Sequence, residues 1–204
     1  AIVKARQGDT SALRDLFRRF RPPVEAYGAR RGLAFRAGEV AQEVFKELAR
    51  DGNLLKADSS KRRFRSLLFA VTWRVIEHHL VRENAPARES WVDSSPADAE
   101  VSIPKDDRDF GREWVTHLLK LSLARLAREN PQQHDALRKF LLEGRSCAEI
   151  SRMLGKPEKE VETCLNRAKD RLVQNIRDEV RGYSASRDEY QEELRYFSRF
   201  LPTT

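Results

Sequence analysis

Asn166 and Arg167 are adjacent residues whose side chains can form paired hydrogen bonds with a partner. Both have the donor and acceptor geometry that reads the edges of adenine and guanine. Glu162, one helical turn earlier, can accept from a cytosine amino group, although its charge also repels phosphate. The candidate DNA-binding residues on this face of the predicted helix are Lys159, Glu162, Thr163, Asn166, Arg167 and Lys169.

A helix-turn-helix over residues 146–176 would position these side chains. Ser146 and Glu149 have the spacing of a capping box at the start of the first helix. Gly155 suits the end of that helix, and Pro157 suits the start of the next. The apolar residues that can pack the two helices are Ala148, Ile150, Leu154, Val161, Leu165, Ala168, Leu172 and Ile176. The alternative interpretation is an ordinary helical hairpin with a solvated charged face.

The composition favours a helical protein with a polyanionic partner. The 204 residues carry a formal net charge of +7 and fit one or two domains. Glycine is sparse and proline is local, so we expect an all-α fold. An acidic membrane surface is the competing partner, but no predicted helix combines a dense basic face with a bulky apolar one.

The sequence indicates neither catalysis nor metal binding. It has no glycine-rich phosphate loop and no nucleophile motif. His78 and His79 are adjacent and would point apart on a helix, and Cys147 and Cys164 match no disulfide or zinc pattern. We therefore expect two reduced thiols, no metal, no cofactor and no enzymatic activity. The lack of a signal segment or a membrane-spanning stretch favours the cytoplasm and no membrane insertion.

Residues 1–84 are predicted to form a helical domain with a basic side. Pro22 and Pro23 are expected to break or bend the chain after Arg21. Arginines on the predicted helix from about 61 to 82 can neutralise the phosphates of a separating duplex. Phe69 and Trp73 could stack on extruded bases, with core packing as an equal alternative. The candidates on this helix are Arg62, Arg63, Arg65, Phe69, Trp73, Arg74 and Arg82.

A second helix of this domain offers acids and an aromatic ring for a protein surface, or else a plain solvated acidic face. Its candidates are Glu39, Gln42, Glu43, Phe45 and Glu47.

The rest of the chain divides by composition. Residues 85–112 are rich in proline and acids and are predicted to be a flexible acidic linker, or a solvated spacer. Residues 113–181 form the helix-turn-helix domain. Residues 182–204 are predicted to be a tail helix, whose single apolar face indicates docking on one of the two domains or, alternatively, binding to a partner.

The order of these parts resembles the extracytoplasmic-function (ECF) sigma factors, the smallest members of the sigma-70 family. The resemblance covers roughly residues 5–181. The stretches that carry it are Gly8-Asp9, residues 13–20, Ala41-Gln42-Glu43-Val44-Phe45, residues 64–71 and His79-Leu80-Val81-Arg82. Residues 113–181 resemble region 4 of that family.

The resemblance implies a division of labour between two domains. Region 2 would bind the clamp helices of core RNA polymerase through the residue 39–47 candidates and open the −10 element through the residue 62–82 candidates. Region 4 would bind the polymerase flap and read the −35 element of promoter DNA through the residue 159–169 candidates. The linker would thread through the polymerase. The protein would then be a non-enzymatic specificity subunit that initiates transcription.

Some positions depart from the family pattern. Arg36, Ala37 and Gly38 precede Glu39 where the family usually has acids, so the polymerase-facing acid patch is thinned. Leu67 and Arg74 replace a usual Trp and a usual Asn. A phosphate on Ser59 or Ser60 would add about two negative charges and could restore polymerase affinity. A Ser/Thr kinase and an anti-sigma factor are thus further candidate partners.

Two other functions are compatible with the same residues. The first is a self-standing helix-turn-helix regulator that binds duplex DNA as a dimer, without polymerase. The second is an anti-sigma-type or scaffold helical protein with no affinity for DNA.

Overall fold

The computed structural model describes residues 2–50, 63–84 and 108–200, and over these ranges the regular structure is entirely helical. The predicted all-α fold is confirmed. Residues 51–62 and 85–107 lie outside the described residues, and with them Ser59, Ser60, Arg62 and most of the predicted linker. The chain divides into two compact units, residues 1–115 with 183–204 and residues 116–182.

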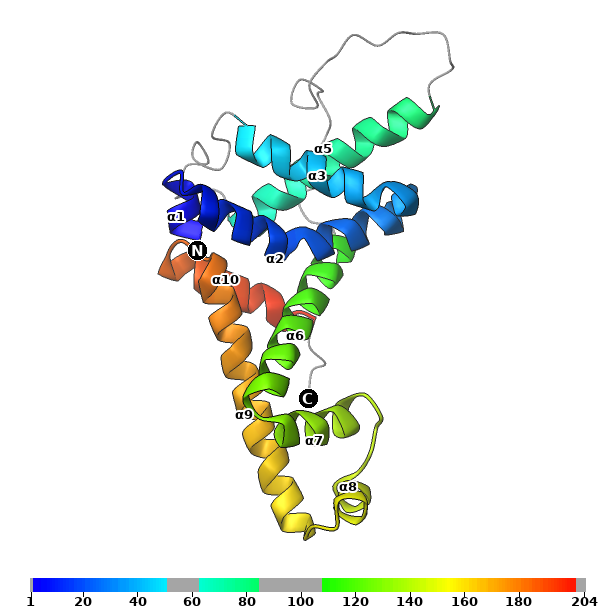
Figure 1. Cartoon of the computed structure of the whole chain (residues 1–204), viewed down its shortest axis with the longest axis vertical. Coiled ribbons are helices and arrows are strands. Elements are labelled where there is room, and N and C mark those ends of the chain that lie inside the picture. The colour runs from blue at the N-terminus through cyan, green and yellow to red at the C-terminus, as the bar shows by residue number, and fades with distance from the viewer. Residues whose placement is uncertain (1, 51–62, 85–107, 201–204) are drawn as a thin grey trace. The chain divides into compact units, whose positions relative to one another are not determined.

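Unit 1 contains the N-terminal helices up to α5 and the C-terminal helix α10 (Figure 1). Helices α2 and α3 pack on each other, and α3 packs on α5. The tail predicted to dock on one of the two domains packs within this unit. Its helices are α1 (Ile2–Arg6), α2 (Thr10–Gly28), α3 (Ala37–Ala49), α5 (Phe64–Asn84), the first turns of α6 (Arg108–Glu129) and α10 (Arg187–Ser198).

Helix α2 continues through Pro22 and Pro23 to Gly28, so a break after Arg21, one of the two predicted alternatives, is wrong. Phe20 and Val24 are completely buried, one on each side of the two prolines. Packing of one continuous buried face therefore offsets the backbone hydrogen bonds that the prolines cannot donate. The chain turns after α2 through a π-helical turn, Ala29–Leu33, in which Gly32 has a φ of 95° that favours glycine.

An aromatic cluster forms the centre of unit 1. The ring of Phe20 stacks on Trp114 at 4.7 Å between centroids and meets Tyr183 edge-on at 5.5 Å. Phe64 lies 5.3 Å from Phe20, so the cluster joins α2, α5, α6 and the end of α9. Each such pair adds about 0.5–1.5 kcal/mol to the free energy gained from burial. Burial, followed by the nearby Glu193 charge, raises the pKa of Tyr183 well above its usual value.

Unit 2 is built from the remainder of α6 with α7 (Pro131–Leu141), α8 (Cys147–Leu154) and most of α9 (Glu158–Tyr183). The predicted apolar stripe of α9 is buried and forms one side of this core: Val161, Leu165, Ala168, Leu172 and Ile176. In α8 only Ile150 is buried, whereas Ala148 and Leu154 are exposed. The expectation that all three pack is wrong, because a helix of just over two turns buries a single position here.

Ion pairs and one amide hold α6 against α9 within unit 2. Glu129 accepts from both Arg125 and Arg171 at 2.8 Å, and Asp178 lies 3.2 Å from Arg125. The hydrogen bonds from Arg171 and Arg125 lower the pKa of Glu129 to about 2. The buried Asn175 amide donates to the Ser122 carbonyl oxygen at 3.4 Å. The outer side of α9 is therefore fixed in orientation relative to α6.

Candidate nucleic-acid interface

The turn between α8 and α9 is defined by local backbone chemistry. Ser146 and Glu149 form the predicted capping box, with the Glu149 amide donating to the Ser146 hydroxyl oxygen and the Glu149 carboxylate accepting from the Ser146 amide. Gly155 ends α8 in the left-handed conformation, with a φ of 62°. Helix α9 begins directly after Pro157. These predictions of the element ends are confirmed.

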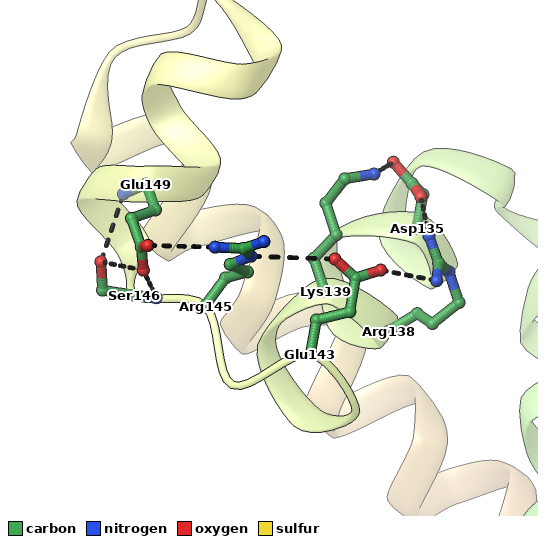
Figure 2. Close-up of polar contacts among 7 residues, drawn as sticks. All are labelled: Asp135, Arg138, Lys139, Glu143, Arg145, Ser146 and Glu149. Atoms are coloured by element: carbon green, nitrogen blue, oxygen red, sulfur yellow. Dashed lines mark hydrogen bonds and ion pairs between the residues drawn. The ribbon is translucent and has the colours of Figure 1, made fainter.

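A chain of charged side chains links α7 to the start of α8 (Figure 2). Glu143 lies 2.6 Å from Arg138 and 4.0 Å from Arg145, and Arg145 lies 3.4 Å from Glu149. Asp135 on α7 pairs with Lys139 and Arg138. The basic residues of this connection are thus already paired with acids. These contacts help to orient α8 relative to α7.

Hydrogen bonding in this connection also lowers the pKa values of two carboxylates. The Ser146 backbone amide and hydroxyl lower the pKa of Glu149, and the Lys139 ammonium lowers the pKa of Asp135. Both groups stay ionised at neutral pH, where the capping box is complete.

The predicted recognition residues are exposed on the side of α9 opposite its buried stripe. Lys159, Glu162, Thr163, Asn166 and Arg167 are all accessible to solvent. The Thr163 hydroxyl donates to the Lys159 carbonyl oxygen at 2.8 Å, which leaves its oxygen able to accept from a partner. Asn166 and Arg167 make no hydrogen bond or ion pair with any other described residue. Their donors and acceptors are available to a partner.

Two further features border this face. The Lys169 ammonium lies 4.5 Å from the centroid of the Phe140 ring, a cation–π contact that holds it near α7. Arg167 lines an open hollow of about 590 Å³ whose other residues are polar or charged: Glu129, Asn130, Gln133, Asp170, Arg171 and Gln174. The pattern of α9 alone could not predict this hollow, because three of its seven lining residues come from outside α9.

The predicted strand-opening residues on α5 have a different environment. Arg65 and Phe69 are buried, with 6% exposure each, so the surface that DNA would need is absent at both in this structure. Trp73 is partly buried under the Arg31 guanidinium, 4.4 Å from the ring centroid. Arg63 forms an ion pair with Glu192. Arg74 is partly buried, and Arg82 is exposed.

Phe69 packs in the core, as the alternative prediction for this residue states. The Phe69 ring lies 5.2 Å from Phe110 and 6.2 Å from Tyr27, within the aromatic core of unit 1. An aromatic residue in this environment cannot stack on a base unless the core opens.

Two of the predicted polymerase-facing residues of α3, Gln42 and Phe45, line a groove of about 500 Å³ between α2 and α3. Its floor is the stacked pair Phe17 and Phe45, with centroids 4.4 Å apart. Gln42 lines the groove and Glu39 is exposed nearby on α3, whereas Glu43 bonds to the His79 ring at 2.8 Å and Glu47 lies 3.4 Å from Arg50. The remaining lining residues are Arg14, Arg18, Arg21, Lys46 and Ala49.

This groove therefore has an apolar floor and a basic rim. The sequence analysis had placed an acidic face here and missed the arginines of α2. Their spacing of three and four residues was the signal that could have identified them.

No group of three or more His, Cys, Asp or Glu that could hold a metal ion occurs among residues 2–50, 63–84 and 108–200. Cys147 and Cys164 are free thiols, each partly buried. No helix in this part of the chain is long and apolar enough to cross a membrane. No protein-family model matches the chain, and no curated protein matches its sequence.

Proposed function

We propose that this protein binds duplex DNA through α9 and reads base edges with Thr163, Asn166 and Arg167. The observation that carries this proposal is the exposure of these three side chains, opposite the buried stripe and directly after the α8–α9 turn. A helix presented in this way fits the major groove, and bidentate contacts from Asn and Arg discriminate adenine and guanine. The net charge of +7 favours approach to a polyanion.

Within that activity, the more specific role is that of an ECF-type sigma factor. The supporting argument is the resemblance of residues 5–181 to the sigma-70 family. In this role unit 2 reads the −35 element and contacts the polymerase flap, while unit 1 contacts the polymerase clamp and takes part in opening the −10 element. The stacked rings Phe17 and Phe45, with Gln42 at the groove edge, offer an apolar anchor for the clamp.

The same role places the protein in the cytoplasm as a non-enzymatic subunit without a cofactor. An anti-sigma factor or a Ser/Thr kinase would then set its availability. The effect of phosphorylation at Ser59 or Ser60 would be tested by comparing the polymerase affinity of the unmodified, the phosphorylated and the Ser→Ala protein.

The test is run-off transcription with core RNA polymerase and genomic DNA. We expect the purified chain to direct discrete transcripts that core polymerase alone does not make. The runner-up, a self-standing regulator, would instead bind an inverted repeat as a dimer and yield no transcripts. A scaffold protein would show no DNA affinity even at low salt.

A further inference from the structure

The N-terminal end of α5 is covered by acidic side chains of α10. Glu193 lies with its two carboxylate oxygens 3.0 and 3.3 Å from the Nε atom of Arg65. Glu192 pairs with Arg63. The two arginines that begin this basic helix are thus neutralised by residues almost 130 positions later in the chain.

A third carboxylate of α10 caps α5 itself. The Phe64 backbone amide donates to Glu189 Oε1 at 3.0 Å, and the Ala185 amide donates to Glu189 Oε2 at 2.6 Å. Residues 189, 192 and 193 share one face of α10, because they are three and four positions apart. One helical face therefore supplies every anionic partner that the structure gives to the first turn of α5.

The two arginine pairs differ in exposure. Arg65 and Glu193 have side-chain exposures of 7% and 1%, and Glu193 also accepts from the Tyr183 hydroxyl at 3.1 Å. Arg63 and Glu192 have exposures of 39% and 45%. An exposed ion pair contributes little to stability, so another anion can readily replace its carboxylate. Breaking a buried pair costs much more, because it leaves a buried charge without a partner. The Glu192 contact is therefore the one from which displacement of α10 can start.

We infer that α10 is an internal competitor of nucleic acid for the basic end of α5, with Glu192 and Glu193 at positions where phosphates bind once the helix is displaced. This inference rests on the proposed function, because it requires unit 1 to contact DNA. Carboxylate and phosphate oxygens accept from guanidinium groups with the same paired geometry. The free protein then has Arg63 and Arg65, at the start of α5, covered by α10, and binding of promoter DNA releases α10.

The first experiment measures the affinity of the full chain for a labelled single-stranded oligonucleotide by fluorescence anisotropy. Glu192→Gln removes the exposed competitor and should tighten binding about 1.5- to fivefold, the range of an exposed ion pair. Asp188→Asn is the matched control, because Asp188 is exposed on the same helix and its substitution removes the same charge. The control should bind as the wild type does.

A double variant tests whether the gain passes through Arg63. Adding Arg63→Gln to Glu192→Gln should abolish the gain in affinity. Equal affinities of Glu192→Gln and Asp188→Asn, or a gain that survives Arg63→Gln, would overturn the inference.

Hydrogen exchange gives a readout that a purely structural role of α10 would not change. On binding of core polymerase and promoter DNA, the amides of residues 187–198 and of Phe64 should lose protection. Unchanged protection would overturn the inference while leaving the proposed function intact. If the chain does not join core polymerase at all, the proposed function itself has failed, and the oligonucleotide comparison still tests the competition.

Discussion

The two candidate DNA-binding surfaces use the same residue types in opposite environments. On α9, Asn166 and Arg167 are exposed and have no partner among the described residues. On α5, Arg65 is buried against Glu193, and Arg63 is paired with Glu192. The exposed side of α9 is thus accessible in this structure, whereas the two arginines at the start of α5 are already paired with carboxylates. An arginine in a sequence indicates possible contact with phosphate, and its neighbours decide whether that contact is available.

The largest expected effect concerns the buried half of this comparison. Glu193→Ala should lower the free energy of unfolding by about 3–5 kcal/mol, because it leaves the Arg65 charge buried without its partner. Glu162→Ala on α9 is the control, since Glu162 is exposed. Its effect should lie within about 0.5 kcal/mol. Chemical denaturation followed by tryptophan fluorescence measures both, and a Glu193→Ala cost below that of the control would break the comparison.

The exposed half should respond in DNA affinity and hardly in stability. Asn166→Ala and Arg167→Ala should each weaken specific duplex binding by about 1–3 kcal/mol, the value of one bidentate base contact. Arg177→Ala, at an exposed arginine near the other end of the same helix, removes an equal charge and should preserve specificity. Titration of duplexes that differ at single base pairs measures the loss. Equal losses for Arg167→Ala and Arg177→Ala would identify Arg167 as a phosphate contact.

The capping box sets how firmly α9 is presented. Ser146→Ala removes the oxygen that accepts from the Glu149 amide and should cost about 0.5–2 kcal/mol of stability. Because the folded pKa of Glu149 is depressed, its contribution is complete above the ordinary carboxylate pKa of 4.5 and is lost as the pH falls through the folded value. Denaturation of wild type and Ser146→Ala from neutral to acidic pH should show the difference shrinking. A pH-independent difference would contradict this assignment.

The smallest effect concerns Glu129, which joins Arg125 and Arg171. Its folded pKa of about 2 lies below the ordinary value of 4.5, so its stabilising contribution should fade between those pH values as the solution is acidified. A carboxyl NMR titration measures this pKa directly, and Glu129→Gln should remove the acid-dependent part of stability in that range. A measured pKa near 4.5 would show that the two arginine contacts do not persist in solution.

The features that the sequence predicted correctly depend on neighbours a few residues apart. The capping box and the buried stripe of α9 follow from spacings of three and four residues, which a single helix fixes. The left-handed end of α8 follows from the glycine at position 155. The contacts of Arg65 with Glu193 and of Phe64 with Glu189 join residues more than 120 positions apart. No local pattern distinguishes Arg65 from an arginine on a solvated basic face.

Two other differences have the same origin. The helix through Pro22 and Pro23 persists because of tertiary packing at Phe20 and Val24, which outweighs local propensity. The groove between α2 and α3 has a basic rim because arginines of α2 lie beside the acids of α3. The residues of α3 alone do not indicate that α2 lies beside them.

The most direct test of the proposed function is a DNA footprint of the full chain on its promoter, recorded with and without core RNA polymerase. We predict protection of two separated elements and an opened downstream element only when polymerase is present, with upstream protection lost in Arg167→Ala. Protection of one symmetric site by the chain alone, unchanged by polymerase, would contradict the account.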